Sequence, residues 1–175
     1  MTENASSLGA HFLDIIPQEL NRIKVRAEKA IAQLREDRHL HVKLDDESNS
    51  LAVIVMHLSG NMLSRWTDFL TTDGEKPSRN RDTEFESAET MTRAELMAAW
   101  ERGWACLFSA LDGLTPADLL ATVRIRGEEF SVMEAIIRQF DHYASHIGQI
   151  VFLAKHLEWE RWQSLSVPRR RPNQS

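Results

Sequence analysis

The chain has 175 residues, of which 42% are hydrophobic and 27% charged, which fits one globular domain with a substantial core. Its net charge of −5 at pH 7 argues against a general nucleic-acid-binding protein, which is usually basic. The single cysteine, Cys106, excludes an intramolecular disulfide. We expect a cytoplasmic protein that does not enter membranes, because the polar N-terminal segment is unlike a signal peptide and no run is apolar enough to span a bilayer.

The first third of the chain has a helical pattern. Apolar residues three or four positions apart predict a helix from about Leu8 to Glu36. Pro17 is awkward inside this pattern, so either the long helix begins at Pro17 or it kinks there. A polar connection is predicted over 39–48.

A second helix is predicted from about Ser50 to Leu70, with Asn49 or Ser48 as its cap. The following segment, 71–89, is polar and contains both glycine and proline, which indicates a long loop. Loops of this length in a compact domain often carry function.

The second half of the chain contains two sequence signals for a helix start. Thr92 and Glu95 form one predicted capping box, and the helix that follows should end at Gly113. A helical turn is predicted at 115–118, and a small hairpin or extended loop at 122–130. A second capping box at 131–134 should begin a long helix that ends near His156.

These elements predict an all-α fold, a four-helix bundle with a small hairpin or loop before the last long helix. We expect the bundle to occupy residues 1–158 and a polar, basic C-terminal tail to occupy residues 159–175.

Three histidines on two predicted helices are the candidate metal ligands. The spacing of His142 and His146 places both imidazoles on one helix face, one turn apart, where they can bind one divalent metal. His57 lies within the apolar pattern of the second helix and is the best candidate for a third ligand. Three imidazoles leave a metal position open for water or substrate, as in a catalytic site.

Polar residues accompany the histidines on both helices. Asn61 and Arg65 lie close to the direction of His57, and Gln149 shares the face of His142 and His146. If these faces meet, the three residues are pocket candidates that orient ligands or bind an anionic group. The alternative is that each histidine is a satisfied or exposed residue and that the polar stripe is a solvated face, since a histidine pair without a nearby carboxylate is less specific than HExxH.

Taken together, the segments 55–66 (VMHLSGNMLSRW) and 142–150 (HYASHIGQI) resemble the DinB/YfiT-like superfamily, and most closely a branch of it that has no established activity. The resemblance covers about 8–157. It implies a four-helix bundle of up-down-down-up order, a metal, typically zinc or nickel, held by His57, His142 and His146, and a homodimer. Some members of the superfamily are S-transferases that use a low-molecular-weight thiol such as bacillithiol, and a related group comprises mycothiol-dependent maleylpyruvate isomerases.

Three functions remain open at this point. The leading hypothesis is a metal-dependent thiol S-transferase acting on a small-molecule substrate, in which the metal lowers the pKa of a bound thiol. A metal-dependent hydrolase would need a general base, and Asp68 is the only carboxylate on the His57 face. The third hypothesis is a non-catalytic, dimeric metal-binding protein of the stress response.

Overall fold

The computed structural model describes the backbone of residues 2–167 and, within that range, the side chains of all residues except 2–6, 85 and 87. The described chain is mostly helical, with one two-stranded antiparallel hairpin. The elements in chain order are α1 (Thr2–Ile31), η1 (Asp37–His41), α2 (Leu51–Trp66), α3 (Arg81–Ala88), α4 (Arg93–Asp112), η2 (Asp118–Leu120), β1 (Thr122–Ile125), β2 (Glu128–Ser131) and α5 (Val132–Leu157). None of the helices in the described residues is long and apolar enough to cross a membrane.

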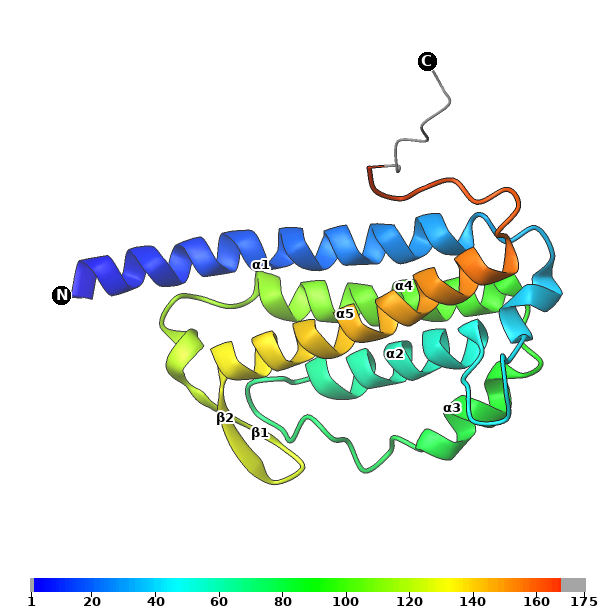
Figure 1. The fold of residues 1–175 in the computed structure, drawn as a ribbon. Helices are drawn as coiled ribbons and strands as arrows, with labels where there is room; N and C mark the ends of the chain where they lie inside the picture. Colours follow the sequence, from blue (N-terminus) through cyan, green and yellow to red (C-terminus); the bar gives the residue numbers. More distant parts are fainter. Residues whose placement is uncertain (1, 168–175) are drawn as a thin grey trace, which may run out of the picture.

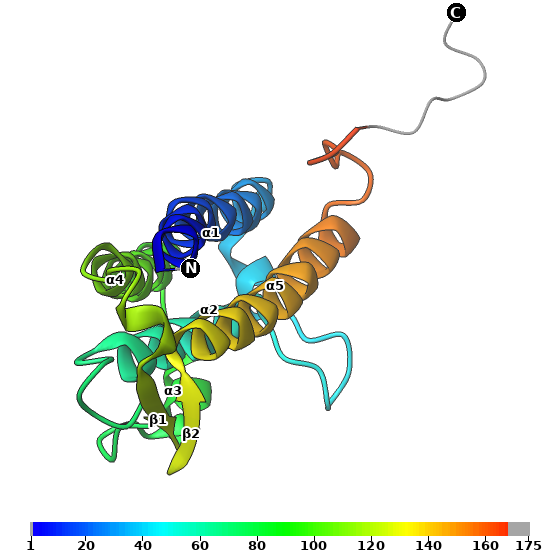
Figure 2. The same cartoon turned by 90° about the vertical axis from the view of Figure 1, so that its left-hand side faces the viewer.

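The four long helices lie side by side, with α3 and the hairpin outside them, next to α2 and α5 (Figures 1 and 2). Helices α1 and α5 run in one direction, and α2 and α4 run in the opposite direction (Figure 1). Because α2 and α4 are parallel neighbours, the chain between them must return along the length of the helices. Residues 67–92 make this crossover, and α3 lies within it.

Several predicted boundaries differ from the observed ones. Helix α1 starts and ends earlier than expected, and Pro17 lies inside it, so the helix does not begin there. Helix α2 is capped by Ser50, whose hydroxyl accepts a hydrogen bond from the Val53 amide, rather than by Asn49 or Ser48. The predicted loop at 71–89 contains α3, which packs on α2.

The strongest local signals are confirmed. Both capping boxes are present, at the starts of α4 and α5. In each, the hydroxyl of the capping residue accepts a hydrogen bond from the backbone amide of the glutamate three residues later, and that glutamate's carboxylate accepts one from the backbone amide of the capping residue. The hairpin forms at the predicted place, and its turn residues Arg126 and Gly127 both have positive φ, as a two-residue hairpin turn requires. Local chemistry therefore determined where these elements begin.

The segment that follows α5 remains in contact with the helices. Trp162 and Leu165 pack against the core, and Gln163 exchanges backbone-to-side-chain hydrogen bonds with Gln33 of α1. The arginine run at 169–171, part of the predicted basic tail, lies outside the described residues.

The core contains large aromatic side chains between the long helices, with Trp100, Trp104 and Tyr143 fully buried. On the side of α2 that faces α4, the packing is close: the Ser59 hydroxyl donates a 2.6 Å hydrogen bond to the Ala99 carbonyl. A Cβ atom on Gly103 would lie only 3.0 Å from Ser59 Cα. Small residues thus allow these two helices to approach each other, and the opposite side of α2 is left for the site.

Candidate metal centre

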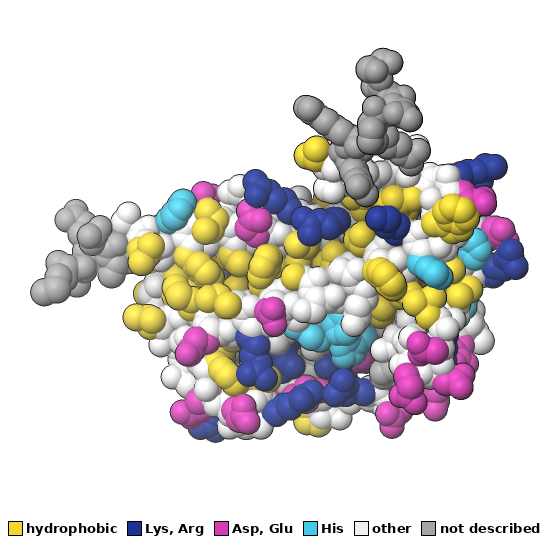
Figure 3. All heavy atoms as spheres, in the orientation of Figure 1, with side chains coloured by type: hydrophobic (Ala, Val, Ile, Leu, Met, Phe, Trp, Pro, Cys, Tyr) yellow, Lys and Arg dark blue, Asp and Glu magenta, His cyan; other side chains and the backbone are white. Residues whose placement is uncertain are grey.

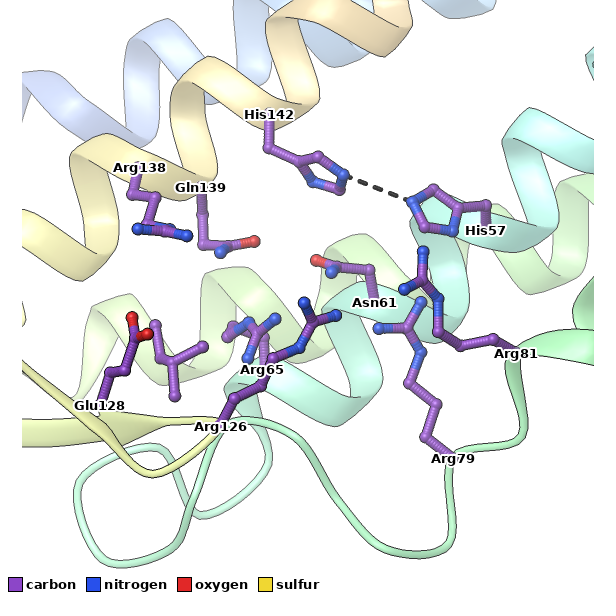
Figure 4. Close-up of a pocket in the computed structure, with 11 residues that line it drawn as sticks. His57, Asn61, Arg65, Arg79, Arg81, Arg126, Glu128, Arg138, Gln139 and His142 are labelled. Atoms are coloured by element: carbon purple, nitrogen blue, oxygen red, sulfur yellow. Dashed lines mark hydrogen bonds between the residues drawn. The ribbon is translucent and has the colours of Figure 1, made fainter.

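The three predicted ligands converge. His57 lies on α2, and His142 and His146 lie one turn apart on α5. One ring nitrogen from each lies within 4.8 Å of those of the other two, so the three could hold one metal ion. The Nε2 atoms of His57 and His142 are 3.3 Å apart (Figure 4). Two nitrogens bound to one tetrahedral zinc are separated by roughly 3.3 Å, given Zn–N bonds of about 2.0–2.1 Å.

Neighbouring side chains orient two of the rings. The Gln149 Oε1 atom accepts a 2.8 Å hydrogen bond from His146 Nδ1, which leaves the Nε2 lone pair of His146 free. His57 Nδ1 makes no hydrogen bond, but lies 3.4 Å from Glu84 Oε2, within ion-pair distance. Partners of this kind commonly fix the orientation and proton position of metal-binding imidazoles.

The electrostatic environment keeps the α5 histidines neutral. Burial, with repulsion by His146 and His57, lowers the pKa of His142 to about 3. Burial also lowers the pKa of His146, against the opposing effect of its hydrogen bond to Gln149. Only the neutral imidazole binds a metal, so these two rings need lose no proton on metal binding at neutral pH.

The crossover between α2 and α4 supplies the carboxylate beside His57. Arg79 holds Glu84 by two hydrogen bonds of 2.7 and 3.0 Å, and both side chains are nearly fully buried. The carboxylate can approach α2 because residue 60 is glycine: a Cβ atom there would overlap it. The glycine thus makes room for the contact between Glu84 and His57.

A pocket of about 330 Å³ opens beside the histidines and is lined mainly by cationic and polar side chains. Figure 3 shows histidine side chains at the surface beside a hollow bordered by Lys and Arg side chains. We call this cavity the arginine pocket; its lining residues are His57, Asn61, Arg65, Arg79, Arg81, Ile125, Arg126, Glu128, Arg138, Gln139 and His142.

A buried hydrogen-bond chain fixes Asn61 at the pocket. The Trp66 indole donates to the Tyr143 hydroxyl at 2.9 Å, and that hydroxyl donates to Asn61 Oδ1 at 3.1 Å. Burial raises the pKa of Tyr143, so the phenol stays protonated and remains a donor. The Asn61 amide group is held by its oxygen, which leaves its NH2 group available.

The three predicted pocket residues do not all line the same cavity. Asn61 and Arg65 line the arginine pocket. Gln149 contacts His146 instead and lines a separate cavity on the other side of the histidines, with Ile54. Asp68, the predicted base of the hydrolase hypothesis, lies beyond the end of α2 and lines a third cavity.

Among the lining residues of the arginine pocket outside α2, only His142 was predicted as a site residue. The others come from the crossover, the hairpin and α5. Two weak signals were present: Gly60 inside a helix three residues after His57, and Gln139 three residues before His142. The pocket residues with charged side chains that were not predicted are Arg79, Arg81, Arg126, Glu128 and Arg138, and Glu84 beside His57 was not predicted either. Gln139 was placed on the face of His142 but was not proposed as a pocket residue.

Fold and site together define a mostly helical protein with a cluster of three histidines that could hold a metal ion. Residues 7–171 match the model of the family described as "Protein of unknown function (DUF1572)", and the chain belongs to this family. No curated protein and no solved structure matches the chain.

Proposed function

We propose that this protein is a metal-dependent enzyme of the DinB/YfiT-like type, a four-helix bundle that transfers a low-molecular-weight thiol to a small-molecule substrate. The observation that carries the proposal is the convergence of three histidine nitrogens at one end of a polar pocket. The opposite directions of the helix pairs α1/α5 and α2/α4 support the up-down-down-up order of that superfamily.

The donor set fits a divalent metal such as zinc or nickel. His57, His142 and His146 supply three nitrogen ligands, and imidazole suits both metals. Three protein ligands would leave a coordination position for water or substrate, which is the arrangement of a catalytic rather than a structural site. When bound, such a metal lowers the pKa of a thiol ligand and keeps it as the thiolate.

The chain's own residues would bind and orient the reactants. Gln149 is hydrogen-bonded to His146 and Glu84 lies beside His57, and contacts of this kind would orient the two rings for a metal. Asn61, fixed by Tyr143, offers an amide NH2 group to a polar reactant. The arginines beside it offer charge-assisted hydrogen bonds.

Metal analysis of the purified protein tests the site. We expect about one metal ion per chain in the wild type and its loss in His142→Ala, with the helical circular dichroism retained. His156→Ala is the matched control, because His156 lies on the same helix and its ring stacks on Phe152, outside the cluster. Stoichiometric metal in His142→Ala would refute the site.

Turnover assays separate the three functions. A thiol S-transferase consumes a panel of electrophiles only when a low-molecular-weight thiol is added, whereas a hydrolase needs no thiol. The hydrolase lacks its predicted base here, because Asp68 lines a different cavity. A binding protein would show metal-dependent thermal stabilisation and no turnover in either assay. Light scattering of the full chain tests the proposed homodimer.

A further inference from the structure

The arginine pocket holds more positive charge than the surrounding chain neutralises. Arg79 is paired with Glu84 through two hydrogen bonds. Arg65 and Arg126 approach the Glu75 carboxylate at 3.5 and 3.1 Å, and Arg79 also approaches it at 3.5 Å. Five guanidinium groups and one carboxylate, that of Glu128, line the cavity, although the chain as a whole carries a net charge of −5.

Two of the five arginines have no acidic partner within the part of the chain that the structure describes. Among the described residues, no carboxylate lies within ion-pair distance of Arg81 or Arg138. Arg138 instead lies over the Phe130 ring, 5.0 Å from its centroid, which fixes the side chain at the pocket edge. Both side chains are exposed, so their charge is free to meet a ligand that enters from solvent.

Arg65 is the buried member of the set. It is 4% exposed, and its Nε and Nη1 groups have no hydrogen-bond partner among the residues that the structure describes. A buried guanidinium with unsatisfied N–H groups is costly, since buried charges are normally paired and hydrogen-bonded. Arg65 lines the pocket, so its buried positive charge adds to the attraction that an anionic ligand would meet there.

The lining residues divide the cavity into two ends. His57 and His142 lie at one end, and Arg138 with Gln139 lies at the other, with Arg65 and Arg126 between them (Figure 4). A guanidinium fork matches the oxygens of a carboxylate or a phosphate. A cavity of about 330 Å³ suits a metabolite-sized molecule.

We propose that the arginine pocket binds a small organic anion, whose carboxylate or phosphate group is held by Arg65, Arg126 and Arg138 while its other end faces the three histidines. This inference rests on the proposed function, because it names the class of molecule that the metal centre acts on. Selectivity for anions follows from the excess of positive charge, and binding weakens as ionic strength rises.

Binding to the metal-free full-length protein tests the proposal, because a metal would itself bind anions. Isothermal titration calorimetry is carried out with succinate, inorganic phosphate and the neutral analogue succinamide. We expect one or both anions to bind, with succinamide bound at least tenfold more weakly, since hydrogen bonds to charged groups are the stronger ones. Comparison of the two anions distinguishes carboxylate from phosphate.

The hairpin offers a matched pair of variants. Arg126→Gln should weaken anion binding roughly tenfold, the loss of one charge-assisted hydrogen bond. Arg124→Gln should leave it unchanged, because Arg124 is paired with Glu129 at 2.8 Å and does not line the pocket. Arg138→Gln, on a different element, should repeat the effect of Arg126→Gln and guards against a local change in the hairpin.

Three outcomes would overturn the inference: neither anion binds, succinamide binds as tightly as succinate, or the Arg124 and Arg126 variants behave alike. The metal analysis of the wild type is independent of these measurements. A protein that holds metal but neither anion contradicts this inference alone, and one that binds an anion but no metal contradicts the proposed function.

Discussion

The face of α2 that packs on α4 contains small and apolar residues, whereas a stripe of polar residues lies on the side toward α5 and the pocket. On the first face, Ser59 bonds directly to the α4 backbone, and Met62 is fully buried beside Gly103. The helices are close there, and no space remains for a ligand. This face therefore contributes stability.

On the second face, His57, Asn61 and Arg65 recur at every fourth position and are at most 9% exposed. Their side chains meet the α5 histidines and the pocket instead of another apolar surface. Burying such groups next to a cavity costs stability that the opposite face must offset. One side of α2 thus packs against α4 and another lines the site. Substitutions on the two sides should therefore have different consequences.

The largest effect is expected on the packing face. Met62→Ala should lower the free energy of unfolding by about 2–5 kcal/mol, because it removes a fully buried side chain and leaves a cavity. Denaturant unfolding measures the change, and metal affinity at low temperature should be unaffected. Leu63→Ala is the matched control, since Leu63 is 40% exposed and should cost much less. Equal losses of unfolding free energy in Met62→Ala and Leu63→Ala would contradict the stabilising role of the packing face.

A smaller effect is expected on the pocket face. Glu84→Gln should weaken metal binding about 10–100-fold, the usual cost of losing a carboxylate that orients a metal-binding histidine. Competition with a chelator of known affinity measures it. Glu86→Gln, on the same helix but exposed, should have no effect on metal affinity.

Gly60→Ala provides an independent check on that carboxylate. The added methyl group would displace Glu84 from His57 without changing any charge. It should therefore reproduce the weakened metal binding of Glu84→Gln, and the double variant should be no worse than either single one. Additive losses would show that Glu84 does not act through its contact with His57.

The smallest effect concerns acid sensitivity of the metal-free protein. The folded-state pKa of His142 is lowered to about 3, so between the unfolded value near 6.5 and pH 3 the unfolded chain binds the extra proton. The contribution of His142 to the free energy of unfolding is therefore fully present above pH 6.5 and is lost as the pH falls. The loss is at most about 1 kcal/mol over the first pH unit, reduced by solvent screening of this partly exposed ring.

His142→Gln should flatten that pH dependence, whereas Met62→Ala should lower stability equally at all pH values. Thermal or denaturant unfolding between pH 7 and pH 5 measures both. An unchanged pH dependence in His142→Gln would assign the acid sensitivity to other groups.

Much of the secondary structure was predictable because its signals are local. The capping boxes at Thr92 and Ser131 and the turn at Gly127 depend only on residues within a few positions. Helix α3 escaped prediction because its residues show little amphipathic pattern; its position is set by packing on α2. Of the two alternatives at Pro17, a helix start is excluded, because α1 extends on both sides of this residue.

By itself, the sequence determined that His142 and His146 share one helix face, because the four-residue spacing is a property of any α-helix. It also marked His57, Asn61 and Arg65 on a second helix as a polar face. Only the tertiary structure decided that these faces meet, that the crossover places Glu84 beside His57, and that the crossover and the hairpin bring Arg79 and Arg126 to the same cavity. Those contacts join residues that are distant along the chain, and neither helical period nor local hydrogen bonding encodes them.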